Sequence, residues 1–277
     1  MRKKFFHLPN KYSYLYFFIP ITLSVIVITN YDNDIWFLLN QGRYIFVHGF
    51  PHVDPFTIHE NLSLVVQQWL SATIFYGAFR LFGEIGLSLL MIGVNLLILY
   101  FLYKIALVIS ENRKKLALFF TILVDVLLLM NFIQTRPQIF TYLILLMLMY
   151  LLEKYQQTNN TRYLFFLPLL SLLEINLHAS MWFMLFLFSA PYVIEIIIDA
   201  CRNDQQKKSF PLLFSMVLIF LVGLINPYGI EAITYIFTSY GNDSINQLVQ
   251  EMQVPQITTN MGIIIYLIVL GVYLTYI

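Results

Sequence analysis

The chain has 277 residues, of which 59% are hydrophobic and only 11% charged, with a mean hydropathy of +0.74 and a net charge of +1. A soluble domain would carry about 25% charged residues, so the composition predicts a polytopic membrane protein. The small net charge gives no reason to expect a nucleic-acid partner. The single cysteine, Cys201, excludes an internal disulfide.

Apolar runs separated by polar segments predict an all-α fold, a membrane helix bundle that forms a single domain over residues 1–277. Residues 64–82 are apolar on one face only, which predicts an amphipathic helix at the membrane surface. The basic start of the chain lacks a small-x-small cleavage site, so we expect its apolar run to be retained as the first span. The eight predicted spans cover residues 13–29, 84–106, 116–133, 138–153, 163–177, 179–199, 210–226 and 260–277.

The distribution of basic residues predicts the orientation. With the N-terminus inside and residues 64–82 outside the membrane core, only Arg43, Arg80 and Arg136 of the 16 Lys and Arg residues lie on the outer side. The positive-inside rule therefore places both termini in the cytoplasm, in a plasma membrane. Two long outer loops follow, at about residues 30–83 and 227–259. Because the unusual polar residues collect outside, cytoplasmic substrates such as ATP or nucleotide sugars are disfavoured.

Two acids, Asp32 and Asp34, directly follow the first predicted span. Carboxylates two positions apart can both approach one centre, where they act as a general base or hold a divalent cation. The alternative is structural, because Asp is a good N-cap and a helix is expected to start near Ile35. Trp36 and Phe37 are expected to anchor this region at the membrane interface.

Arg136 lies between two predicted spans and precedes Pro137, which ends one helix or starts the next. An outward arginine opposes the positive-inside trend. A phosphate on a lipid-linked substrate would explain it, since arginine binds phosphate through two parallel hydrogen bonds. Snorkelling toward lipid headgroups is the open alternative.

Glu174 and His178 stand four positions apart at the end of a predicted span, and so share one helical face. They either contact substrate or line the bundle as a satisfied polar pair. No three-ligand spacing occurs, so no dedicated metal site is expected. Asp125 falls in the middle of a span, where it is either functional or paired across the bundle. Asn226-Pro-Tyr-Gly229 predicts a turn that ends a span and opens the second outer loop.

The order of these motifs is more informative than any one of them. Asp-x-Asp-x-Trp, Gly-Arg, Pro-x-x-Asp-Pro-Phe, Gln-Trp-Leu, Arg-Pro-Gln, Asn-x-His and Asn-Pro-Tyr-Gly follow one another between about Asp32 and Pro255. This order resembles bacterial polytopic proteins of the GT-C glycosyltransferase superfamily, in a short or truncated form. The resemblance implies a catalytic Asp34 or Asp32, a sugar donor carried on a polyprenyl phosphate, and transfer outside the cytoplasm. The residues expected to bind substrate are Arg136, Gln138, His52, Asp54, Trp69, Glu174, Asn176, His178, Asn226, Tyr228 and Glu251.

Two other functions stay open at this point. A transporter or lipid-handling protein would need a site at the membrane midplane, for which Asp125 is the candidate. A non-catalytic subunit of a cell-envelope assembly complex, with a membrane-protein partner, is favoured by the short chain and by departures from the family pattern at Leu38, Gln67 and Glu174. No cofactor is required by any of the three, although the acid pair could take a divalent cation.

Overall fold

The computed structural model describes residues 20–25, 31–201, 209–240 and 263. The chain divides into two compact units, Met1–Ile233 and Thr234–Ile277. Only residues 234–240 and 263 of the second unit are described, so the architecture below is that of the first. Most of the predicted first span, the inner loop at 202–208, Glu251 and nearly all of the last span lie outside the described residues. The expected single domain over 1–277 stays a prediction.

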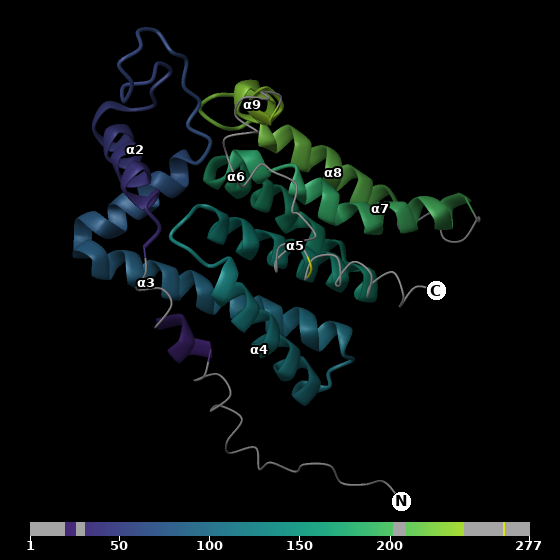
Figure 1. Ribbon diagram of the computed structural model, residues 1–277. Coiled ribbons are helices and arrows are strands. Elements are labelled where there is room, and N and C mark those ends of the chain that lie inside the picture. Colours follow the sequence, from purple (N-terminus) through teal and green to yellow (C-terminus); the bar gives the residue numbers. More distant parts are fainter. Residues whose placement is uncertain (1–19, 26–30, 202–208, 241–262, 264–277) are drawn as a thin grey trace, which may run out of the picture. The chain divides into compact units, whose positions relative to one another are not determined.

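The described residues are helical and form no strand, which confirms the all-α fold class (Figure 1). Their only β-type pairing is an isolated bridge between Val53 and Ser63, in the loop after α2. The helices are α2 (Ile35–His48), α3 (Trp69–Ile109), α4 (Lys114–Asn131), α5 (Gln138–Thr158), α6 (Leu167–Leu177), α7 (Met184–Cys201), α8 (Ser209–Gly223) and α9 (Ile230–Tyr240), with 3-10 turns η2 (Thr161–Phe166) and η3 (Ala179–Met181).

In the part of the chain that the structure describes, three helical segments are long and apolar enough to cross a membrane: Trp69–Ile109, Gln138–Thr158 and Ala179–Ile198. Large apolar side chains also point outward, for example Phe119 and Met130 of α4 and Leu187 of α7. A water-facing surface of this kind would be unfavourable, whereas a lipid-facing one is ordinary. The chain therefore has the helices and the outer surface of a membrane protein, while eight spans remain a prediction.

Two predicted elements differ from the structure. Residues 163–177 do not form one continuous helix, because η2 gives way to α6 at Leu167, next to Pro168, whose ring cannot donate a backbone hydrogen bond. Residues 230–240 form helix α9 in a region predicted as loop. Helix α9 has only 11 residues and follows the turn residues Pro227 and Gly229, which are typical of a loop.

Helix α3 bends sharply at Phe82 and Gly83, whose backbone angles are not helical. Gly83 has a φ of +61°, which a side chain would strain. Beyond the bend the chain folds back so closely that a Cβ on Gly86 would lie 2.1 Å from the carbonyl oxygen of Ala78. This bend separates an arm at 69–81 from an arm at 84–109, as the sequence predicted for 64–82 and 84–106. The first arm begins later than predicted, at Trp69.

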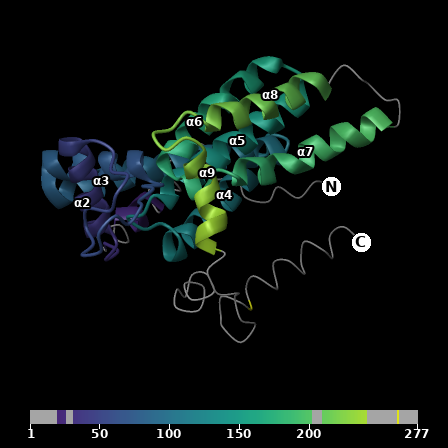
Figure 2. The same ribbon diagram turned by 90° about the horizontal axis from the view of Figure 1, so that it is seen from above.

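The first arm of α3 packs against α2 through another glycine. A Cβ on Gly42 of α2 would lie 2.1 Å from the carbonyl oxygen of Ala72, so only glycine allows this crossing. Helix α5 contacts α3, α6 and α7, and α7 also contacts α8 alongside it (Figure 2). Fully buried side chains fill the contacts, among them Phe75, Leu148 and Leu167. Such close packing is the main source of helix association in lipid.

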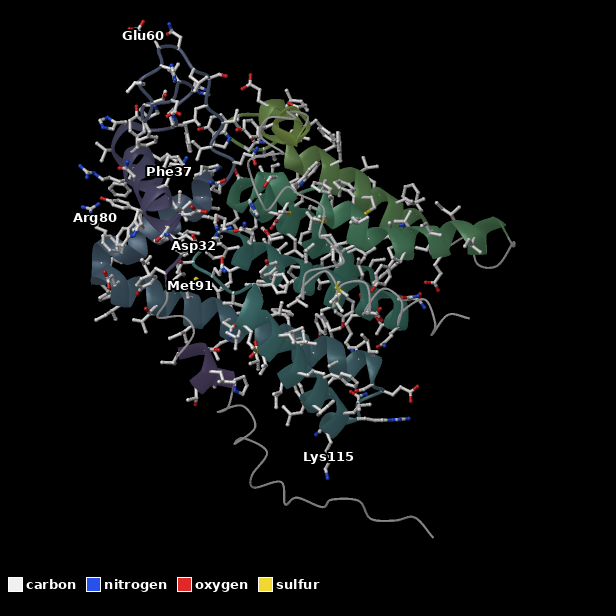
Figure 3. The ribbon with its side chains drawn as sticks, viewed as in Figure 1. Asp32, Phe37, Glu60, Arg80, Met91 and Lys115 are labelled. Carbon is white, nitrogen blue, oxygen red and sulfur yellow. The ribbon has the colours of Figure 1, made fainter. Side chains whose placement is uncertain are left out.

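The loop after α2 and the loop before α4 lie at opposite ends of this unit. Figure 3 shows Glu60 at the tip of the first and Lys115 at the start of the helix that follows the second. This separation agrees with the prediction that the two loops face opposite sides of a membrane. Asp32, with which the next section begins, lies between these two ends (Figure 3).

Candidate functional site

The acid pair forms a tight turn directly before α2. The backbone N–H of Asp34 donates to Asp32 Oδ1 at 3.0 Å, and the N–H of Ile35 donates to the Asp32 carbonyl at 3.1 Å. Helix α2 begins at Ile35, as predicted. Asp34 occupies the N-cap position, but its side chain accepts no capping hydrogen bond. The interpretation of Asp34 as a helix cap is therefore wrong, and its carboxylate is used elsewhere.

Arg136 binds both carboxylates. Its Nε lies 2.8 Å from Asp32 Oδ2, and its Nη2 lies 2.9 Å from Asp34 Oδ2. The neighbouring Thr135 accepts a hydrogen bond from the backbone N–H of Asp32 at 3.1 Å. Pro137 is the N-cap of α5, so the helix begins at Gln138, two residues after Arg136. Arg136 therefore lies outside the helix, in the segment that reaches the acid turn. Two motifs that the sequence treated separately thus form one constellation.

The two acids have different environments. The side chain of Asp32 is 17% exposed and that of Asp34 is 71% exposed. Burial alone would raise the pKa of Asp32, but the hydrogen bonds from the Asp34 backbone and from Arg136, with the charge of Arg136, lower that pKa below its ordinary value. Asp32 is therefore a fixed anion, and Asp34 is the carboxylate that a substrate can reach. The constellation as a whole carries one net negative charge.

A divalent cation does not fit this constellation as it stands. The guanidinium of Arg136 already neutralises one oxygen of each carboxylate at hydrogen-bonding distance. A cation between the same acids would have to displace that positive charge. Within the described part of the chain, no group of three His, Cys, Asp or Glu side chains is arranged to hold a metal.

A second polar cluster lies deeper and is centred on Thr141 of α5. The Thr141 hydroxyl donates to Glu174 Oε1 at 2.6 Å and lies 2.9 Å from His178 Nδ1. Because the hydroxyl has one proton, His178 Nδ1 must then donate to it. All three side chains are buried, and Glu174 Oε2 has no partner among the described residues. Glu174 lies in the last turn of α6, whereas His178 directly follows the helix with a non-helical backbone, so the two meet through Thr141 and not along one helical face. Both side chains line the bundle rather than face solvent.

A third cluster joins α3, α6 and the segment after α8. Trp69 Nε1 donates to Asn176 Oδ1 at 2.8 Å, and Asn176 Nδ2 donates to the Ile225 carbonyl at 3.0 Å. The hydroxyl of Ser71 binds the Leu177 carbonyl, and the backbone N–H of Ala179 binds the Gln67 carbonyl. These bonds fix the end of α6 against the start of α3. Trp69 and Asn176, both predicted to bind substrate, are thus brought together, and each uses a polar group to bind the other.

The turn at Asn226 connects this cluster to the loop after α2. Asn226 Oδ1 accepts from the Tyr228 N–H at 2.9 Å, and its amide donates to the carbonyls of Gly223 and Gly229, as a helix stop would require. The Tyr228 hydroxyl donates to the Pro51 carbonyl at 3.0 Å, and its ring packs edge-on against His52 at 5.4 Å. The two outer segments that the sequence predicted are therefore in contact through Tyr228.

Three further residues behave differently from expectation. Asp54 accepts from the Phe56 N–H at 2.8 Å and so closes a local turn. Gln138 directs its Oε1 into the protein, where that atom has no partner among the described residues. Asp125 is fully buried in α4, and Asn95 of α3 is the polar side chain that faces it, although neither carboxylate oxygen meets hydrogen-bonding geometry within the described residues.

Sequence reasoning missed the threonines that link the predicted residues. Thr135 and Thr141 flank Arg136 and Gln138 at the start of α5, and each bonds a predicted site residue from another element. An ordinary threonine beside an Arg-Pro-Gln motif carries no chemical signal of its own. The available signals were positional: Thr135 is adjacent to Arg136, and Thr141 lies in the first turn of α5, three residues after Gln138.

Comparison with protein-family models, with curated proteins and with solved structures gives no match for this chain.

Proposed function

We propose that the chain is a membrane glycosyltransferase that moves a sugar from a polyprenyl-phosphate donor to an acceptor on the outer side of the membrane. The observation that supports this proposal most is the contact of Arg136 with both Asp32 and Asp34. It unites an exposed carboxylate, a mostly covered anion and a cation at the turn directly before α2. The resemblance to GT-C proteins suggests Asp34 or Asp32 as the catalytic acid, and the greater exposure of Asp34 favours Asp34.

In this mechanism Asp34 is the general base. Its exposed carboxylate takes the proton of an acceptor hydroxyl while the hydroxyl oxygen attacks the anomeric carbon of the donor sugar. The bond between that carbon and the phosphate oxygen breaks, and its electron pair leaves with the lipid phosphate. The proton on Asp34 then passes to water. No metal is needed for this balance of atoms and charge.

Asp32 and Arg136 position the base. Asp32 is held by Arg136, by Thr135 and by the Asp34 backbone. Arg136 in turn is held by Asp32 and bonds Asp34, so the base has a fixed direction although it is exposed. The sequence suggested that Arg136 binds the donor phosphate, but its guanidinium already contacts two carboxylates. The geometry of Arg136 therefore favours a role in positioning Asp34.

The proposed arrangement in the membrane has eight spans and both termini in the cytoplasm. The 13-to-3 distribution of basic residues supports it, since 16 Lys and Arg residues include only Arg43, Arg80 and Arg136 on the proposed outer side. The separation of Glu60 from Lys115 in the structure also agrees with it (Figure 3). The acid pair would then face outward, where polyprenyl-linked sugars are used.

Glycan analysis tests the proposed activity. Lipid-linked sugars and surface polymers are extracted from cells with and without the protein and compared by mass spectrometry. The proposal expects that cells without the protein accumulate an unused lipid-linked sugar and lack one glycosylated product. Identical profiles from the two strains under conditions of expression would reject it, and would favour the alternative of a non-catalytic membrane subunit.

A further inference from the structure

The other two proposed outer arginines meet in one hollow, apart from the acid constellation. Arg43 comes from α2 and Arg80 from the first arm of α3, and both line an open cavity of about 570 Å³. The remaining lining residues are Trp36, Leu39, Asn40, Tyr76 and Phe79. Their positions on α2 repeat at three- and four-residue steps, which places them on one helical face. The Gly42–Ala72 crossing brings the two helices close enough to form this hollow.

Both arginines are available for an anion. Both are exposed, and neither pairs with a carboxylate within the described residues. The guanidinium of Arg80 lies 4.9 Å from the ring centre of Phe46, which holds it in place without neutralising its charge. Figure 3 shows Arg80 at the outer edge of the molecule, away from Asp32. Two unneutralised cations in one hollow favour a ligand with two or more acceptor oxygens.

The surroundings of the hollow indicate an amphiphile. Trp36 packs edge-on against Phe79 at 6.2 Å and is half exposed, as is typical of a tryptophan at a membrane interface. Just beyond Arg80, the side chains of Leu81, Phe82 and Ile85 are among the most exposed apolar ones of α3. An exposed apolar surface therefore begins directly after Arg80, next to the cationic hollow. A molecule with an anionic head and a hydrocarbon tail would match both parts.

We infer that the hollow between α2 and α3 binds the phosphate group of an isoprenoid phosphate, with Arg43 and Arg80 as its ligands and the tail along Leu81, Phe82 and Ile85. Trp36 and Tyr76 provide the apolar walls, and Asn40 offers a further donor. This inference rests on the proposed function for its choice of an isoprenoid tail, and it assigns a binding place for the lipid phosphate, not the position of that phosphate during transfer. Binding at this hollow does not itself require transfer activity.

The test measures binding by the full-length protein in phosphatidylcholine nanodiscs, with native mass spectrometry as the readout. Farnesyl monophosphate is the probe, and farnesol and inorganic phosphate are the comparison ligands. The inference expects farnesyl phosphate to bind at least tenfold more tightly than farnesol. Arg43→Gln and Arg80→Gln should each weaken binding about tenfold and the double variant about a hundredfold. Arg113→Gln, in an exposed loop on the proposed inner side, is the matched control and should bind as wild type does.

Two comparisons identify the source of the phosphate. Inorganic phosphate that binds as tightly as farnesyl phosphate, with the same dependence on both arginines, would support the phosphate site and assign it to a soluble ligand. Phosphatidylglycerol that displaces farnesyl phosphate at equal concentration would support the phosphate site and assign it to bulk anionic lipid. Equal affinity of wild type and the double variant for farnesyl phosphate would overturn the inference, as would equal affinity for farnesyl phosphate and farnesol.

Two variants separate this inference from misfolding and from the proposed activity. Arg43→Lys with Arg80→Lys keeps both charges and should recover part of the binding, which a structural defect would not do. Asp34→Asn removes the proposed base but should bind farnesyl phosphate as wild type does. Arginine-independent binding combined with an Asp34-dependent glycan would reject the hollow and retain the enzyme. Binding that depends on the two arginines, together with a glycan that Asp34→Asn leaves unchanged, would retain the hollow and reject the proposed enzyme.

Discussion

Arg136 and Asp32 are 104 positions apart in the sequence, and they meet through Nε and Oδ2 at 2.8 Å. The same guanidinium reaches Asp34 at 2.9 Å. The contact fastens the segment after the first predicted span to the start of α5. Within this contact Asp32 is mostly covered and Asp34 mostly exposed, which is the reason for proposing Asp34 as the base.

A double-mutant cycle measures how strongly this pair is coupled. Asp32→Asn and Arg136→Gln should each lower the free energy of unfolding, and together they should cost less than the sum of the two. We expect a coupling of about 1–3 kcal/mol, since the bond is charge-assisted and partly buried. Thermal or denaturant unfolding in detergent gives the four values. Strictly additive losses would show that the two side chains do not interact.

Arg136→Lys distinguishes a positioned guanidinium from a simple charge. Lysine keeps the positive charge but cannot bind both carboxylates through a planar fork. Glycosyl transfer should therefore fall about tenfold in Arg136→Lys and further in Arg136→Ala, with membrane abundance close to wild type. Product formation is followed by mass spectrometry. Full activity of Arg136→Ala would remove this residue from the site and leave it as a headgroup anchor.

The Asp32–Arg136 pair should make stability depend on pH. The folded protein lowers the pKa of Asp32 below 3.8, so the ionised carboxylate contributes stability above the unfolded value. That contribution is lost as the pH falls through the lower folded pKa. The melting temperature of wild type should therefore drop more than that of Asp32→Asn between about pH 5 and pH 3. Parallel curves for the two proteins would contradict this linkage.

The Thr141 cluster offers a test of structure without chemistry. Thr141→Val keeps the shape of the side chain but removes the hydroxyl that joins Glu174 and His178. Two buried polar groups lose a partner, so unfolding should become easier by about 1–3 kcal/mol. Thr73→Val is the matched control, because its hydroxyl only bonds carbonyls of its own helix, and it should change little. A similar small effect at both positions would show that the cluster does not stabilise the bundle.

Single-cysteine labelling tests the proposed orientation. On a background without Cys201, an impermeant reagent applied to intact cells should label a cysteine at position 57 and not one at position 206. The first position lies in the loop after α2, and the second is in a predicted inner loop with Lys207 and Lys208. Labelling at 206 but not at 57 would invert the topology and with it the side on which the acids act.

Local signals in the sequence predicted local structure well. Asp34 and Pro137 marked the starts of α2 and α5, and the one-sided apolar pattern of residues 64–82 distinguished the first arm of α3 from the second. Each of these features depends on residues that are close together in the chain. The two errors are at helix boundaries. The predicted span 163–177 is divided near Pro168, and the short helix α9 lies inside the predicted loop 227–259.

The candidate site could be predicted only in part. The sequence supplied Asp32, Asp34 and Arg136, but not their contact, because nothing local specifies which outer acid an outer arginine will meet. It also misread the Asp34 side chain as a possible cap, since a capping aspartate and a paired aspartate look alike until the partner is known. Trp69 and Asn176 were both identified, yet their mutual hydrogen bond depends on the fold of α3 against α6.

The most direct test of the proposed function is the glycan profile of a deletion strain that carries either wild type or Asp34→Asn. Asparagine has nearly the same shape as aspartate but cannot accept the proton of an acceptor hydroxyl. The proposal predicts that wild type restores the missing glycosylated product and that Asp34→Asn, at equal membrane abundance, does not. Restoration of the full product by Asp34→Asn would contradict it.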